Sequence, residues 1–104
     1  GNAMRYLLTG DLFSAREALR IGMIQEMTPE DPFDRALSIA ETIASQAPLA
    51  VQATIASVRE SMVDGEEKAM GNLLPVARQL MKTEDAAEGL RSFLERREAQ
   101  FRGK

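Results

Sequence analysis

The chain lacks the residue types on which much enzyme chemistry depends. It contains no cysteine, no histidine and no tryptophan, and Tyr6 is its single tyrosine. Without cysteine there is no disulfide and no thiol nucleophile, and without histidine no serine–histidine pair, imidazole acid/base or histidine metal site can form. Acid–base work would fall to carboxylates, lysine or Tyr6. The composition therefore limits the reactions that this chain could catalyse by itself, and we predict no catalytic residue.

Long apolar runs and basic clusters are missing as well. No apolar run approaches the roughly 20 residues of a membrane helix, and no signal peptide is visible. The 13 basic residues are dispersed in a chain of net charge −3, so we expect neither a membrane nor a nucleic-acid partner. At 104 residues, 44% hydrophobic and 28% charged, the chain reads as one globular domain, residues 1–104. The absence of cysteine fits a cytoplasmic protein.

The segment from Leu8 to Ile24 carries the strongest local signals. Ser14 suits a helix N-cap, and Glu17 three residues later completes a capping box. Gly22 supplies a left-handed residue that ends the helix. Residues 23–27 have no strand partner, so we expect an irregular connector there.

Three longer helices are expected between residues 31 and 82. Asp31 and Pro32 suit the cap and first position of a helix that runs from Phe33 to Ala47 with helical apolar spacing. The next runs from Pro48 to about Val63, ends at Gly65 and carries many small residues. A third spans residues 66–82, with a kink or a break near 72–75 because proline disrupts a helix interior.

Thr83 caps a last helix, in whose C-terminal half Arg96, Arg97 and Arg102 favour the helix dipole. The chain therefore reads as all-α, with about four main helices plus short helical turns. Glu66 and Glu67 are expected to be structural. Glu84, Asp85 and Glu88 at the last helix could offer oxygen ligands to a cation, but we expect a solvated helix start and no metal site.

Two further features of the last helix leave alternatives open. Gly89 costs stability in a helix interior and reads equally as tolerated or as a site of close approach. Phe93, Arg96 and Arg97 share a face at i, i+3, i+4 spacing. An aromatic ring and guanidinium groups suit a purine and phosphates, although a basic helix end is the commoner explanation.

Taken together, these segments resemble the C-terminal helical region of the crotonase, or enoyl-CoA hydratase/isomerase, superfamily. The resemblance covers nearly the whole chain, in the family's order and at about its spacing. It rests on Ala3–Gly10 (AMRYLLTG), Ser14–Gly22 (SAREALRIG), Ala47–Thr54 (APLAVQAT), and Thr83–Gly89 (TEDAAEG) followed by Phe93–Arg97 (FLERR).

The resemblance implies what such a region does in the family. The family's two catalytic glutamates and its glycine-rich oxyanion turn precede the stretch matched by Ala3–Gly10, and no Gly-Gly pair occurs here. Residues matching Phe93 and Arg96 approach the adenine and phosphates of CoA. The chain departs from the family pattern at two positions where lysine is common. Ile55 replaces one of these lysines, and Arg96 replaces the other and keeps its positive charge. The implied protein needs no cofactor and takes acyl-CoA as substrate.

Two functions follow from these observations. The first is a C-terminal domain of a hydratase (lyase) or isomerase of fatty acyl-CoA metabolism, without the catalytic spiral core and inactive alone. It would close the acyl-CoA site and support oligomerisation. The second is a self-standing helical protein-interaction module. Gly1-Asn2 could be an expression remnant, but we favour native residues of a longer chain. We expect self-association as a dimer or larger, the parent family being trimer-based.

Overall fold

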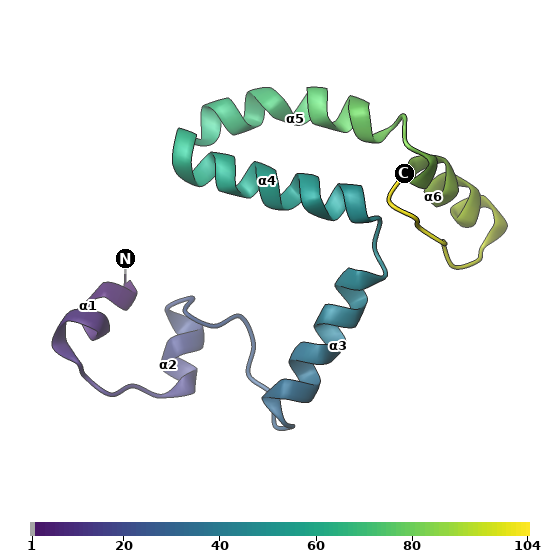
Figure 1. Cartoon of the computed structure of the whole chain (residues 1–104). Helices are drawn as coiled ribbons and strands as arrows, with labels where there is room; N and C mark the ends of the chain where they lie inside the picture. The colour runs from purple at the N-terminus through teal and green to yellow at the C-terminus, as the bar shows by residue number, and fades with distance from the viewer. Residues whose placement is uncertain (1) are drawn as a thin grey trace. The chain divides into compact units, whose positions relative to one another are not determined.

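The computed structural model describes residues 2–104, and its regular elements in that range are all α-helices. The prediction of an all-α chain with four main helices and short helical turns is therefore confirmed. The chain divides into two compact units, Gly1–Ile39 and Ala40–Lys104, whose boundary lies within the third helix. The helices are α1 (Asn2–Thr9), α2 (Ala15–Arg20), α3 (Pro32–Ala44), α4 (Pro48–Asp64), α5 (Glu66–Leu80) and α6 (Glu84–Glu95), as Figure 1 shows.

Both ends of α2 form as the sequence predicts. The Ser14 hydroxyl accepts a hydrogen bond from the Glu17 amide at 3.2 Å, which satisfies one of the amides left unpaired at a helix start. Beyond the helix, Gly22 has φ 76°, and the Met23 amide donates to the Ala18 carbonyl at 2.9 Å. This is the Schellman arrangement, in which a left-handed residue lets the chain turn back on the last helical carbonyls. No strand follows: residues 23–31 are irregular.

The capping box around Ser14 is only half formed, because the Glu17 carboxylate is used elsewhere. Its Oε1 accepts from the Tyr6 hydroxyl at 2.9 Å, and Arg20 donates to both carboxylate oxygens at 2.6 Å. These bonds lower the pKa of Glu17 to about 2, with Arg20 the larger cause. The Tyr6 ring also packs on Phe13, with centroids 4.3 Å apart. Glu17 therefore joins α1 to α2.

Helix α3 begins as expected and ends early. Asp31 accepts from the Phe33 amide at 2.8 Å, the N-cap contact that its position suggested. The helix stops at Ala44, whereas the apolar spacing predicted Ala47. Ala47 has φ −59° and ψ 114°, outside the helical region, because the ring of Pro48 disfavours helical geometry in the residue before it.

Helices α4 and α5 form an antiparallel hairpin (Figure 1). Gly65, with φ 95°, separates them. Lys68 pairs with Asp64 at 2.7 Å across the turn, and Asn72 donates to Glu60 at 2.7 Å between the two helices. The hairpin is the main helix–helix contact of the unit Ala40–Lys104.

Of the two alternatives expected near residues 72–75, a kink or a break, the break is wrong. Helix α5 is continuous and contains Pro75. The residue at i−4 from Pro75 is Gly71, whose carbonyl loses its usual partner and meets the proline ring. Open space surrounds the position of a Cβ on Gly71. Helix α5 thus stays helical through Pro75 along the hairpin in which it packs against α4.

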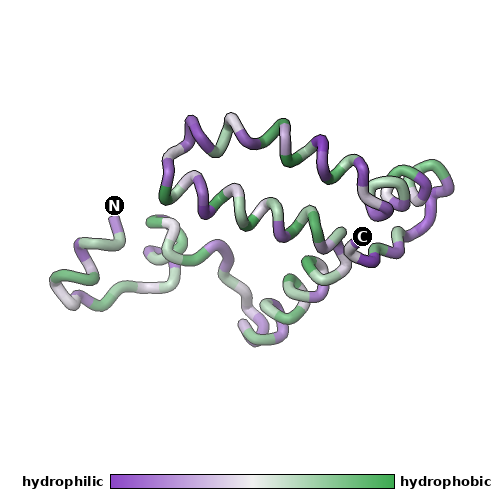
Figure 2. Tube along the Cα trace, turned by 45° about the horizontal axis from the view of Figure 1, so that its top comes forward, coloured by the Kyte–Doolittle hydropathy of each residue, from purple (hydrophilic) through white to green (hydrophobic). Residues whose placement is uncertain are grey.

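Buried apolar side chains are few among residues 2–104. Ala18 and Ala69 are the hydrophobic residues that are buried, while hydrophobic positions recur along the helices (Figure 2). Three apolar side chains of α4 are exposed: Ile55 by 47%, Val58 by 54% and Met62 by 83%. None of the helices in the described range has the length and apolar character needed to cross a bilayer.

Candidate functional site

The site suggested by the sequence lies at the C-terminal end of α6. Thr83 caps the start of this helix, where its hydroxyl accepts from the Ala86 amide at 3.1 Å, as predicted. The helix ends at Glu95 and Arg96 takes the left-handed conformation, with φ 53° and ψ 44°. The Arg97 amide then donates to the Ser92 carbonyl at 3.1 Å. This is again a Schellman end, with arginine where glycine is usual.

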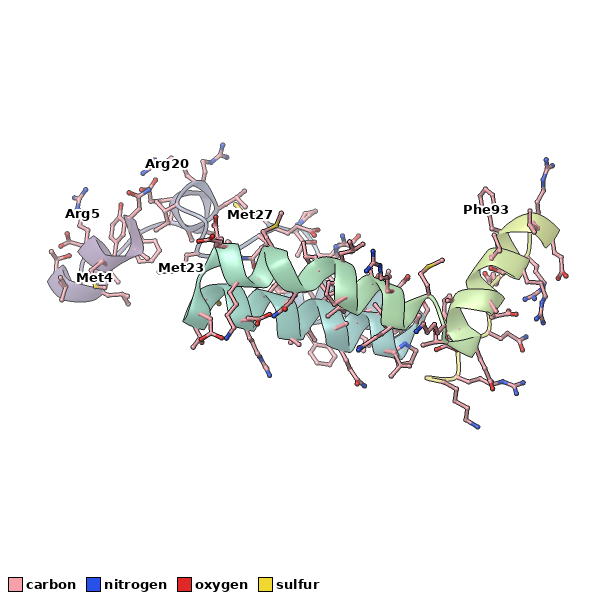
Figure 3. The ribbon with its side chains drawn as sticks, turned by 90° about the horizontal axis from the view of Figure 1, so that it is seen from above. Met4, Arg5, Arg20, Met23, Met27 and Phe93 are labelled. Carbon is pink, nitrogen blue, oxygen red and sulfur yellow. The ribbon has the colours of Figure 1, made fainter. Side chains whose placement is uncertain are left out.

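The predicted helical face of Phe93, Arg96 and Arg97 is therefore wrong, since only Phe93 is helical. Phe93 is 79% exposed, and its ring stands off α6 (Figure 3). Leu90 and Leu94 on the same helix are also exposed, at 63% and 72%. Phe93 thus belongs to an open apolar face rather than to a core.

Arg96 and Arg97 differ sharply despite their adjacency. Arg97 donates to Glu88 Oε1 at 2.5 Å and to Oε2 at 3.0 Å, and to Glu95 at 2.6 Å. These bonds raise the pKa of Arg97, with Glu88 the larger cause. They also hold the pKa of Glu88 at about 2. Arg96 is exposed, and its guanidinium has no ion-pair partner within residues 2–104. Arg96 is the arginine that remains available to a ligand.

The acidic residues at the start of α6 are not the solvated cluster that we expected. Asp85 is 3% exposed, and its two oxygens accept from the amides of Arg102 at 2.7 Å and Gly103 at 2.8 Å. Glu88 accepts from the Gln100 amide at 3.0 Å. Glu84 alone stays exposed, as predicted. Sequence reasoning missed this role because the amides that bind these carboxylates belong to residues 12 to 18 positions away.

A cavity of about 550 Å³ lies between α6 and the residues that follow it. Charges of both signs surround it, and two of its carboxylates are already bonded to backbone amides. Within the described range, no group of three or more His, Cys, Asp or Glu side chains is placed to hold a metal ion. Its lining residues are Glu84, Asp85, Ala87, Glu88, Arg91, Arg97, Gln100 and Arg102.

Gly89 lies beneath an aromatic ring. A Cβ placed on it would stand 3.7 Å from Phe101 Cε1, which is ordinary van der Waals contact. Of the two interpretations of Gly89, a tolerated glycine is therefore the one that fits, because the ring of Phe101 leaves room for a Cβ.

Chemically, the end of α6 offers the exposed aromatic ring of Phe93 and the guanidinium of Arg96, three residues further along the chain. An aromatic ring suits a flat heterocycle, and a guanidinium suits an anionic group. Of the carboxylates on α6, Glu88 and Glu95 bind Arg97, and Asp85 binds backbone amides.

Comparison with known proteins agrees with the sequence resemblance. The family model for enoyl-CoA hydratase/isomerase matches residues 1–104. The (E)-benzylidenesuccinyl-CoA hydratase of Thauera aromatica is 42% identical over 97% of this chain and 40% of its own length. The crotonyl-CoA hydratase of Syntrophomonas wolfei is 34% identical over 97% and 39%.

Solved structures show the same relationship. A probable enoyl-CoA hydratase/isomerase from Mycobacterium abscessus superposes with a TM-score of 0.92 and 48% identity, over 100% of this chain and 41% of that one. The enoyl-CoA hydratase of Mycobacterium tuberculosis gives 0.84 and 31%, over 98% and 41%. The chain thus spans about two fifths of the length of the relatives it matches. On the sequence match and the fold together, the chain belongs to the enoyl-CoA hydratase/isomerase family.

Proposed function

We propose that this chain forms the C-terminal part of an acyl-CoA hydratase or isomerase and helps to close its acyl-CoA site. Phe93 stacks on the adenine of CoA and Arg96 pairs with its phosphates. The observation that carries the proposal is the contrast between neighbours: Arg97 is bound by Glu88 and Glu95, while Arg96 and Phe93 are exposed. An exposed aromatic ring suits a purine, and an unpaired guanidinium three residues further along the chain suits its phosphates.

The proposal gives these 104 residues no hydratase chemistry of their own. Water addition to an enoyl thioester requires preorganised donors for the developing oxyanion and a placed acid and base. The relatives whose names record hydratase activity are more than twice as long as this chain. The acyl-CoA is substrate of the whole enzyme, with no cofactor, in fatty acyl-CoA metabolism.

Self-association is the second part of the proposal. The α4 stripe of Ile55, Val58 and Met62 is exposed, and open apolar surface of this kind favours contact with another protein surface. We propose a dimer or larger assembly.

CoA contact is tested in a longer protein that joins these residues to the preceding segment of the M. abscessus relative. Phe93→Ala and Arg96→Ala should each raise the KM for crotonyl-CoA about tenfold, the order expected for one lost ligand contact, with kcat nearly unchanged. Arg91→Ala, an exposed arginine of α6, is the matched control. Unchanged KM in both Phe93→Ala and Arg96→Ala would refute the proposed contact.

A further inference from the structure

The C-terminal tail, residues 96–104, runs back along α6 towards its start (Figure 1). The hydrogen bonds follow this path in order. Glu88 accepts from the Gln100 amide, and Asp85, one turn earlier, accepts from the amides of Arg102 and Gly103. The tail has no regular secondary structure, so these carboxylates supply acceptors that a helix or sheet would otherwise provide.

Asp85 is the centre of this attachment. Its carboxylate binds two successive amides, and its own amide donates to the Lys104 carbonyl at 3.0 Å. The side chain is 3% exposed, so these three bonds form away from solvent. Hydrogen bonds to an ionised carboxylate are shorter and stronger than neutral ones, so Asp85 ties the last residues of the tail, 102–104, to the first turn of α6.

The tail in turn contacts α4. Gly103 has φ 72°, and a Cβ built on it would stand 3.7 Å from both Cβ and Cγ of Pro48, the first residue of α4. The other connection of α6 to the hairpin is the short segment after α5, where the Thr83 hydroxyl donates to the Leu80 carbonyl at 2.7 Å. One covalent link leaves a helix free to pivot, whereas a second attachment restricts it.

We propose that Asp85 is a positioning residue: by holding the tail against both α6 and Pro48, it fixes the orientation of α6 on the α4–α5 hairpin. It thereby sets where Phe93 and Arg96 are presented. Asp85 itself is buried under the tail and touches no ligand. The consequence for CoA rests on the proposed function, whereas the orientation of α6 does not.

The absence of cysteine allows a direct test on this chain. Two exposed positions are changed to cysteine, by Gln52→Cys on α4 and Leu94→Cys on α6. Each cysteine carries a spin label, and pulsed electron paramagnetic resonance measures the distribution of distances between the two labels. We expect one narrow distribution in the parent chain. Asp85→Ala should at least double its width. Glu84→Ala removes an equal charge from the same helical turn and should leave it unchanged.

Deletion of residues 102–104 tests the route through the tail and guards against simple misfolding of Asp85→Ala. The deletion keeps Asp85 and removes its partners, so it should broaden the distribution equally. Combining it with Asp85→Ala should add nothing, as for two changes that break one interaction. Circular dichroism checks that α6 stays helical. A narrow distribution in either Asp85→Ala or the deletion overturns the inference.

The CoA contact is measured separately. If Asp85→Ala broadens the distance distribution while Phe93→Ala and Arg96→Ala leave the KM of the longer protein unchanged, the positioning of α6 stands and the proposed function fails. If Phe93→Ala and Arg96→Ala raise the KM but the distance distribution stays narrow in Asp85→Ala, the proposed CoA contact stands and the positioning role of Asp85 fails.

Discussion

Glu88 binds the guanidinium of Arg97 through both carboxylate oxygens, at 2.5 and 3.0 Å. The same carboxylate also accepts the amide of Gln100. Arg97 therefore stabilises the turn after α6, while the guanidinium of the preceding residue, Arg96, is exposed and has no ion-pair partner among residues 2–104. Two adjacent arginines that look equivalent in sequence thus have different surroundings, one ion-paired and one exposed.

The first prediction concerns pH. Glu88 has a pKa of about 2 in the folded chain, chiefly because of Arg97, well below its ordinary value of 4.5. A depressed folded pKa gives stability that is present above the ordinary value and lost as the pH falls through about 2. The Gln100 amide shift, followed by NMR, should therefore stay constant down to about pH 3. A midpoint near 4.5 would contradict the bidentate pair. Glu88→Gln should shift the same signal at every pH.

The second prediction concerns the left-handed arginine. Arg96 has φ 53°, which costs a residue with a Cβ about 1 kcal/mol. Arg96→Gly should therefore raise the free energy of unfolding by about that amount, measured with urea. In the longer protein it should also raise the KM for acyl-CoA. Arg96→Gln should raise the KM without the gain in stability. A glycine variant with no gain in stability would show that the turn is unstrained.

The third prediction compares two glycines that lie in open space. Gly22 has φ 76° after α2, so Gly22→Ala should cost about 1–2 kcal/mol of stability. Gly71 has no such conformation and lies within α5, so Gly71→Ala should gain about 0.5–1 kcal/mol. Urea unfolding of both variants gives the two signs. Equal effects would mean that the Gly22 turn does not limit stability.

The fourth prediction concerns self-association through α4. Val58→Asp places a charge in the exposed apolar stripe and should shift the chain towards monomer in sedimentation velocity. Gln52→Asp, on the same helix at an exposed polar position, should leave the distribution as in the parent. A parent chain that stays monomeric at high concentration would refute the proposed association.

Local chemistry explains which features of the fold could be predicted from sequence. Caps and stops such as Ser14, Asp31, Gly22 and Thr83 act within a few residues, so their contacts appear as expected. The end of α3 depended on Pro48, which follows it in sequence. Helix α5 is continuous through Pro75 in its hairpin with α4, a contact between two helices that no local signal contains.

The candidate site divides in the same way. The sequence placed Phe93 on the last helix, where the structure has it. The face that Phe93 was expected to share with Arg96 and Arg97 required the helix to continue to residue 97, whereas the helix ends at Glu95. The left-handed turn at Arg96 contains no glycine, so the sequence gives no signal that the helix ends there. The role of Asp85 depends on Arg102 and Gly103, 17 and 18 residues away, and acidic residues at a helix start also have a purely local explanation.

The most direct test of the account is hydration of crotonyl-CoA by the purified 104-residue chain. Loss of the enoyl thioester absorbance is followed at saturating substrate, and activity is compared with protein across chromatographic fractions. We expect no turnover above the buffer rate from the chain alone, and turnover when the chain is joined to the preceding segment of its relative. Turnover that rises and falls with the chain alone would contradict it.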